Sequence, residues 1–258
     1  MNFIEIFKDS LKYPTLDFKK LLILGILVMV CGIFTFLGTS STNDNAMAIL
    51  ALISLIITLV VDFVIQGHII DIIGVGITQK DEIPAINFKD DFVLGIKSFI
   101  VEIVYYIIPI ILIIALIFLT GGFDYLVTIL TNTDLNNIGD NVAIIFAGSI
   151  FFTVVVSVIL VIIFSLVSIV AFGKLGKTGN LKEACSVGTI ISETKKIGFL
   201  NMLAYIIVLM IIDFIILLIS SIISILIPLV GFIIAALILM PYLLMFNARA
   251  MGLIYSKV

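Results

Sequence analysis

Two aspartates inside long apolar runs are the residues of this chain best suited to chemistry within a membrane. Asp213 has leucines one helical turn to either side, so its hydrogen-bond partner must come from another helix or from water. Asp62 has Thr58 and Gln66 one turn away on its own helical face. An ionisable group inside a bilayer is costly and by default marks a candidate functional site. We therefore predict an intramembrane polar site at Asp213 and Asp62.

A second candidate site is an ion pair at the ends of the apolar runs where basic residues gather. Arg249 follows the last run, and Asp62, Asp71 and Glu102 lie near the same end of theirs. Because a guanidinium can bind a carboxylate with two parallel hydrogen bonds, we expect Arg249 to pair with one of these acids. Such a pair would act as a structural clamp or as part of a gate or ion path.

Enzymatic chemistry has little support in the sequence. Helical rise puts Asp62 and Asp213 roughly 13 Å apart along the membrane normal, and the Gly-x-Gly-Asp pattern of intramembrane aspartyl proteases is absent. His68 is the single histidine, which excludes a multi-histidine metal site, and we expect it to be an interfacial residue. Neither a Gly-x-Ser-x-Gly turn nor a phosphate-binding glycine loop is present. We expect a protein that is not an enzyme and has no metal or cofactor.

The elements that must position these residues are membrane-spanning helices. Hydrophobic residues make up 62% of the 258 residues, charged residues only 12%, and mean hydropathy is +1.38, whereas charged residues are about a quarter of soluble proteins. A spanning helix needs about 20 apolar residues, and six runs qualify. They cover residues 21–37, 46–67, 99–120, 143–172, 199–219 and 228–247, with a turn expected between Ser220 and Gly231. We predict an all-α membrane protein with six transmembrane helices in one integral membrane domain, residues 1–258.

All 14 lysines and arginines fall on one side of these spans. They precede the first, third and fifth spans or follow the sixth, while the alternate loops carry aspartates such as Asp44, Asp124 and Asp134. By the positive-inside rule, both termini face the cytoplasm. We therefore expect a multi-pass protein of the cell membrane.

A short amphipathic stretch precedes each odd-numbered span. The three apolar faces are formed by Phe3, Ile4, Phe7 and Leu11; by Phe88, Phe92, Ile96 and Phe99; and by Leu181, Ala184, Gly188 and Ile191, with Asn180 and Glu183 as an N-cap pair. The pattern predicts three short cytoplasmic interfacial helices and suggests a threefold parallel repeat of interfacial helix plus hairpin. The alternative is that any helix that enters a bilayer is amphipathic at its edge.

Several short motifs resemble a family of polytopic proteins of archaea and some bacteria, catalogued as domain of unknown function 4013. These are Gly67-His68-Ile69-Ile70-Asp71, Ile83-Pro84-Ala85-Ile86-Asn87-Phe88, Gly95-Ile96-Lys97, Arg249-Ala250-Met251-Gly252-Leu253-Ile254-Tyr255, and the opening Ile6-Phe7-Lys8-Asp9-Ser10-Leu11-Lys12-Tyr13-Pro14. This chain departs from many members at His68 and Asp71, where they have an aromatic and a basic residue. The resemblance implies architecture and carries no activity.

The leading function class is a non-enzymatic small transport or permeation component, with Asp213 and Asp62 as lining residues. The alternative is a structural or partner-binding membrane subunit that docks through its cytoplasmic amphipathic helices. Basic residues on the cytoplasmic side are interspersed with acids, so we expect neither a nucleic-acid site nor a strong lipid-headgroup site. The lipid bilayer is the expected partner, and a protein partner or a homo-oligomer stays open.

Overall fold

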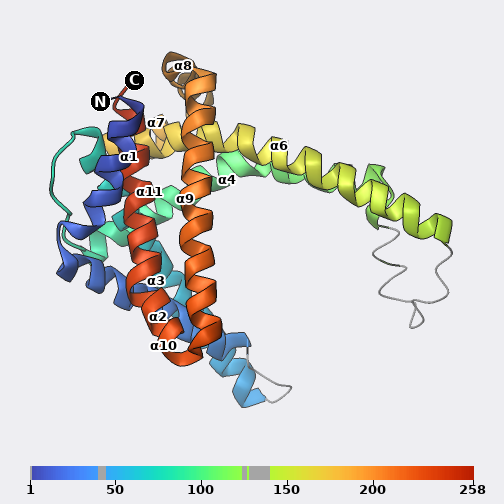
Figure 1. Ribbon diagram of the computed structural model, residues 1–258, viewed down its shortest axis with the longest axis horizontal. Helices are drawn as coiled ribbons and strands as arrows, with labels where there is room; N and C mark the ends of the chain where they lie inside the picture. Colours follow the sequence, from blue (N-terminus) through green and yellow to red (C-terminus); the bar gives the residue numbers. More distant parts are fainter. Residues whose placement is uncertain (1, 40–44, 124–126, 128–139) are drawn as a thin grey trace. The chain divides into compact units, whose positions relative to one another are not determined.

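The computed structural model describes residues 2–39, 45–123, 127 and 140–258, and every regular element within them is helical. Six helical segments are long and apolar enough to cross a membrane, which confirms the six predicted spans. These segments are α2 (Phe18–Thr39), α3 (Asn45–Ile77), α4 (Phe88–Leu119), α6 (Asp140–Thr178), α9 (Phe199–Leu226), and α10 (Pro228–Ile234) followed by α11 (Met240–Tyr255) (Figure 1). Asp44, Asp124 and Asp134 of the predicted acidic loops lie outside the described residues.

The helices extend beyond the predicted spans at the end of the bundle where the basic residues gather. Helix α3 continues past Gly67 to Ile77, and α4 begins at Phe88 rather than near Phe99. Hydropathy marks only the part of a helix that lies in hydrocarbon, whereas a helix can continue into the headgroup layer and water because its backbone hydrogen bonds are satisfied within the helix. Residues 78–87 are therefore the whole connection between α3 and α4, and Asp71 and Asp91 lie on helices.

Three short helices accompany the spans: α1 (Phe3–Lys12), α7 (Leu181–Ala184) and α8 (Val187–Ile197). Asn2 and Glu5 form a capping box at α1, and the predicted cap Asn180 accepts a hydrogen bond from the backbone at the start of α7. The amphipathic stretch that begins at Phe88 is the first part of α4 and not a separate helix. Helix α1 packs against the protein through Ile6, Phe7 and Ser10, whereas Ile4 and Leu11 of the predicted apolar face are exposed.

Two compact units divide the chain. The first contains residues 1–101 and 169–258, and the second contains residues 102–168 of α4 and α6. Within the second unit, hydrogen bonds of 3.2 Å between Tyr106 and Ser165 and of 3.3 Å between Thr120 and Thr153 join the two helices. All the candidate residues except Glu102 belong to the first unit.

Glycines allow helix backbones to touch in the first unit. A Cβ atom at Gly67 would collide with the backbone of Asp91, and one at Gly252 would lie 2.8 Å from the Cα atom of Gly76. A Cβ atom at Gly25 would likewise collide with the backbone of Leu237. Leu237 belongs to a π-helical turn, Ala235–Leu239, between α10 and α11. The predicted turn between the fifth and sixth spans is also confirmed, since α9 ends at Leu226 and α10 begins at Pro228.

Candidate functional site

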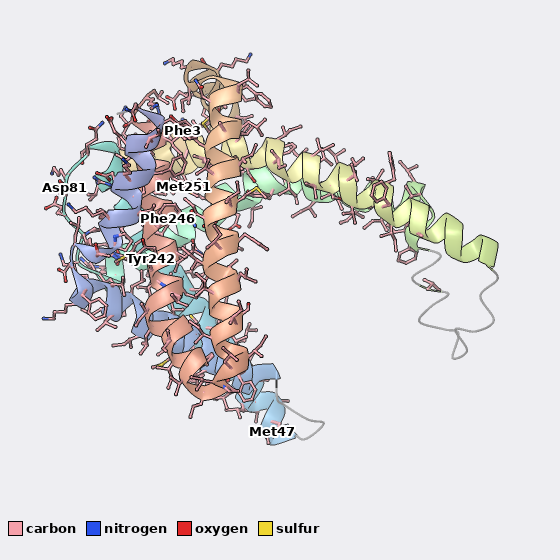
Figure 2. The ribbon with its side chains drawn as sticks, in the orientation of Figure 1. Phe3, Met47, Asp81, Tyr242, Phe246 and Met251 are labelled. Atoms are coloured by element: carbon pink, nitrogen blue, oxygen red, sulfur yellow. The ribbon has the colours of Figure 1, made fainter. Side chains whose placement is uncertain are left out.

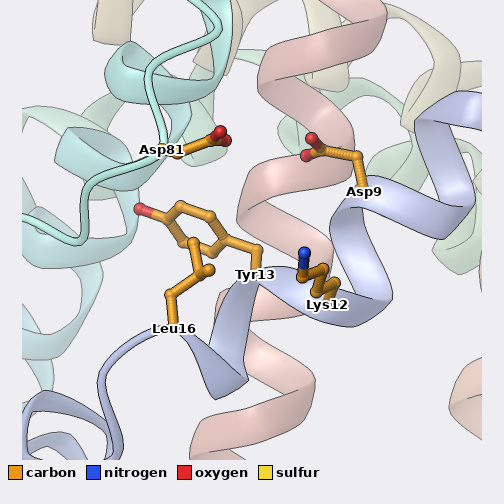
Figure 3. A pocket seen from close by; sticks show the side chains of 5 residues that line it. All are labelled: Asp9, Lys12, Tyr13, Leu16 and Asp81. Carbon is orange, nitrogen blue, oxygen red and sulfur yellow. The ribbon is translucent and has the colours of Figure 1, made fainter.

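Arg249 is the centre of a buried polar cluster and is only 1% exposed. Its Nε donates to Asp9 Oδ1 at 2.6 Å, and its Nη2 donates to Asp9 Oδ2 at 3.3 Å and to Asp81 Oδ1 at 3.2 Å. Its Nη1 donates to the carbonyl oxygen of Lys80 at 2.6 Å. Figure 3 shows the carboxyl groups of Asp9, on α1, and Asp81, on the 78–87 connection, facing each other. Each guanidinium nitrogen therefore has a partner.

Tyr13 completes this cluster, which we call the Arg249 clamp. The guanidinium carbon lies 4.8 Å from the centroid of the Tyr13 ring, a cation–π contact, and the phenol donates to the carbonyl oxygen of Glu82 at 2.7 Å. Burial raises the pKa of Tyr13, and the positive charge of Arg249 only partly offsets this. The clamp ties α1 and the 78–87 connection to α11. Tyr242 of α11 adds a 2.7 Å hydrogen bond to the Leu11 carbonyl (Figure 2).

Arg249 thus pairs with carboxylates, but they are not those that the sequence suggested. Asp71 lies beside Asp91 instead. The difference arises because α1 folds back against α11 and brings Asp9 to the guanidinium, a contact between residues 240 positions apart. Glu102 is an exposed residue of α4 in the second unit.

A second polar cluster lies at the C-terminal end of α11. Lys174 Nζ lies 2.8 Å from Glu193 Oε1, and the Tyr255 hydroxyl donates to Glu193 Oε2 at 2.9 Å. Burial alone would raise the pKa of Glu193, but these two hydrogen bonds and the charges of Lys174 and Lys196 bring it below its ordinary value. This cluster connects α6, α8 and α11.

His68, which we expected at the membrane interface, is fully buried within the protein. Its Nδ1 lies 3.9 Å from Asp91 Oδ2, and Asp91 is also fully buried. Within the described residues, both imidazole nitrogens and Asp91 Oδ1 have no hydrogen-bond partner. The contact between Gly67 and the backbone of Asp91 explains the burial, since it brings α3 and the first turn of α4 together around the imidazole.

The two intramembrane aspartates each pair with an amide. Asn247 Nδ2 of α11 donates to Asp213 Oδ1 of α9 at 3.0 Å, so the partner comes from another helix as predicted. Asp62 is hydrogen-bonded to Gln66, one turn along α3. The Asp213 carboxyl accepts a hydrogen bond from the NH₂ group of Asn247. The amide oxygen of Asn247 is buried and has no hydrogen-bond partner among the described residues.

These two amides line one pocket of about 220 Å³. Ser98 is its third polar wall residue, and most of the remaining wall is apolar, including Met251 (Figure 2). No lysine, arginine or carboxylate is among its lining residues. The candidate aspartates thus do not line the pocket themselves but are hydrogen-bonded to its lining residues Gln66 and Asn247.

Sequence reasoning found both aspartates and Arg249 but missed most of their partners. Asn247 marks the end of the predicted sixth span, and a primary amide at that place was a usable signal. Asp9 lies in the opening motif that carried the family resemblance. Asp81 had no signal, because a charged loop residue looks the same whether it is solvated or paired.

Six apolar helices of spanning length define a multi-pass α-helical membrane protein. More particularly, the chain belongs to the family described as proteins of unknown function, DUF4013, whose family model matches residues 50–235. The match includes Asp62, Asp213 and the His68 motif, whereas Asn247 and Arg249 follow it. No curated protein and no solved structure matches the chain. Within the part of the chain that the structure describes, no group of three or more His, Cys, Asp or Glu side chains is arranged to hold a metal ion.

Proposed function

We propose that this protein is a non-enzymatic small transport or permeation component, and that the pocket between Gln66, Ser98 and Asn247 takes up its solute. The observation that carries the proposal is the pairing of two intramembrane carboxyls with two amides of the same pocket wall. Asp213 and Asp62 are the residues that give the site its charge.

The cost of burying these carboxyls supports the proposal. Ionisable groups within a span are rare and usually face a cavity or a partner. Here each carboxyl has one hydrogen bond to a primary amide, which leaves further lone pairs without protein donors. An unpaired buried acceptor such as Asn247 Oδ1 costs about 1–3 kcal/mol, a cost that a hydrogen-bond donor bound in the pocket would remove.

The wall of the pocket suits a small polar solute or a cation. Its volume of about 220 Å³ exceeds that of one water molecule, about 30 Å³. Its polar groups are a hydroxyl and two amides, with carboxyls behind the amides, so the electrostatic field favours positive charge or hydrogen-bond donors. An anion would meet two carboxyls and no basic side chain on the wall.

The test is flux through the protein reconstituted in liposomes. Proton, Na⁺ and K⁺ movement is followed with trapped fluorescent indicators under an imposed diffusion potential. Wild-type vesicles should carry at least one of these cations faster than protein-free vesicles. Asp213→Asn keeps the shape of the side chain but removes its charge, and it should lower this flux by tenfold or more.

Glu102→Gln is the matched control, because Glu102 is an exposed acid of another span and does not line the pocket. It should leave the flux unchanged. Equal flux in wild-type and Asp213→Asn vesicles, or a wild-type flux no greater than that of empty vesicles, would contradict the proposal.

The proposed arrangement in the membrane follows from the one-sided basic residues. The chain is inserted in the cell membrane as one domain, with both termini and the 78–87 connection in the cytoplasm. Helices α1 and α8 lie in the cytoplasmic interface, where exposed apolar residues such as Ile4 and Ile191 meet lipid. A threefold parallel repeat has less support, because the middle unit has no separate interfacial helix.

A partner-binding subunit is the second candidate. Ile4 is 63% exposed on α1 and Val187 is 44% exposed on α8, although the opposite faces of both helices are held in the polar clusters. Rigidly held helices with exposed apolar side chains are suitable docking elements. In that case Ile4→Ser would abolish association with a partner and leave cation flux unchanged.

A further inference from the structure

A second pocket lies where α2 begins and is separate from the proposed solute site. Its charged wall is formed by Asp17, Lys19 and Lys20, and its apolar wall includes Ile23 of α2 and Phe88, the first residue of α4. Residues 84–86 of the 78–87 connection close it. Its volume is about 380 Å³.

The two lysines and one aspartate that line this pocket give it a net charge of one positive unit. Asp17 caps α2 by accepting from the Lys20 backbone N–H at 3.1 Å, and its carboxylate lies 3.8 Å from Lys20 Nζ. The Lys20 ammonium also donates to the carbonyl oxygen of Ile83, which fixes it at the pocket. Lys19 is exposed and has no counter-charge among the lining residues.

The apolar wall of this pocket and its neighbours are of the residue types that favour the membrane interface. Phe18 is 57% exposed, Phe88 is 61% exposed and Ile23 is 40% exposed. Phe18 and Phe88 are the first residues of α2 and α4, and Ile23 lies in the second turn of α2. Aromatic side chains and lysines together are typical of the interface, where lysine ammonium groups reach the lipid headgroups. The pocket therefore combines a charged rim with an apolar wall, the combination expected of a site at the headgroup layer.

We propose that this pocket binds an anionic phospholipid of the bilayer. The lipid phosphate lies against the ammonium groups of Lys19 and Lys20, and one acyl chain runs along Ile23 and Phe88. Basic pockets between transmembrane helices bind anionic headgroups in this way. A free phosphate would leave the apolar wall in contact with water, so the combination of wall and rim favours a lipid over a soluble anion.

Sequence reasoning expected no strong headgroup site, because acids alternate with bases along the chain. The proposal departs from this expectation, because the acids Asp90 and Asp91 that follow Phe88 are not among the lining residues. Only Asp17 opposes the two lysines, and it is already occupied as the cap of α2.

The absence of tryptophan from the chain makes a fluorescence test clean. Phe88→Trp places a single tryptophan on the apolar wall with little change in size. The variant is reconstituted in two kinds of vesicle. One contains brominated phosphatidylglycerol in unbrominated phosphatidylcholine, and the other contains brominated phosphatidylcholine in unbrominated phosphatidylglycerol. One uncompensated lysine is worth about a five-fold preference for an anionic lipid, so phosphatidylglycerol should quench about five-fold more effectively at low mole fraction.

Two substitutions in the Phe88→Trp background separate this site from general surface charge. Lys19→Gln should reduce the preference to about one, and Lys8→Gln, an exposed lysine of α1 outside the pocket, should leave it unchanged. Ala85→Phe should also abolish the preference, because it fills the pocket without a change of charge. Native mass spectrometry of the wild-type chain, with phosphatidylglycerol retained over phosphatidylcholine, gives the same comparison without the tryptophan.

Equal quenching by the two lipids would overturn the proposal, as would equal effects of Lys19→Gln and Lys8→Gln. Displacement of the brominated phosphatidylglycerol by millimolar inorganic phosphate would show that the pocket is a soluble-anion site instead.

Discussion

Arg249→Met removes the guanidinium of the clamp and keeps an unbranched side chain in its place. The arginine is 1% exposed and makes four hydrogen bonds with Asp9, Asp81 and the Lys80 carbonyl. The variant therefore loses the contacts that attach α1 and the 78–87 connection to α11. We expect a large loss of stability and no large change in helix content.

The two carboxylates should contribute unequally to this loss. The Asp9 side chain is 26% exposed and lies 2.6 Å from Nε, so a charge-assisted hydrogen bond worth about 1.5–3 kcal/mol applies. The Asp81 side chain is 77% exposed, and an ion pair of that kind is worth about 0–1 kcal/mol. Part of the loss is recovered because methionine needs no desolvation of charge. The net cost of Arg249→Met is about 2–3 kcal/mol, with the Asp9 contacts as its largest part.

Thermal unfolding of the purified protein in detergent micelles, followed by far-UV circular dichroism, measures this cost. A loss of about 2–3 kcal/mol corresponds to a fall in Tm of about 5–10 °C for a chain of this size. Double-mutant cycles with Asp9→Asn and Asp81→Asn then apportion it. The coupling energy of Arg249 with Asp9 should be at least about 1.5 kcal/mol, and that with Asp81 should be below about 1 kcal/mol.

An unchanged Tm in Arg249→Met would refute the reasoning. A coupling to Asp81 as large as that to Asp9 would also refute it, because burial would then not determine the strength of the pair.

Two further predictions concern stability. Burial opposes ionisation of Glu193, but its hydrogen bonds and the charge of Lys174 lower its pKa below the ordinary glutamate value. The ionised Glu193 therefore stabilises the fold fully above the ordinary glutamate pKa, and this contribution is lost as pH falls through the lowered pKa. When Tm is measured against pH in acid, Glu193→Gln should flatten this part of the curve, and an identical curve in the variant would disprove the linkage. Gly67→Ala should cost more than about 2 kcal/mol, because its methyl group meets the backbone of Asp91. The control Gly188→Ala has open space around it and should stabilise by up to about 1 kcal/mol; equal Tm values for the two glycine variants would contradict the close crossing.

The spans were predictable because hydropathy and the one-sided lysines report directly on the bilayer. Helix ends were less predictable, since a helix can continue beyond the hydrocarbon. This error concealed the pairing of His68 with Asp91, which depends on α3 continuing past Gly67 and on α4 beginning at Phe88. The amphipathic stretch of α1 was recognised from the sequence, but the face that it buries depends on contacts such as that of Phe7 with Tyr205 of α9, a residue far away in the sequence.

In the candidate site, too, some features were predictable from the sequence and others were not. An acid within an apolar span can be recognised from the residues around it in the sequence, so Asp62 and Asp213 were found from the sequence. The partner of Asp62 was also predictable, because Gln66 lies one turn away. The partner of Asp213 is on another helix, and Asn247 is one of many polar residues that could have met it. Tertiary partners of this kind require the packing of the helices to be known.

The central claim is that the pocket lined by Gln66 and Asn247, the amides that bind Asp62 and Asp213, is open to water within the membrane. Ser98→Cys places a thiol on its wall with little change in shape, in a background where Cys31 and Cys185 are replaced by serine. Ser220, a buried serine of α9 that does not line the pocket, provides the matched Ser220→Cys control. The labelling rate with a small water-soluble methanethiosulfonate reagent in vesicles is the most direct measurement. We predict that Ser98→Cys reacts at least tenfold faster than Ser220→Cys and that occupation of the pocket by a transported cation slows it. Equal, slow labelling of the two thiols would contradict the account.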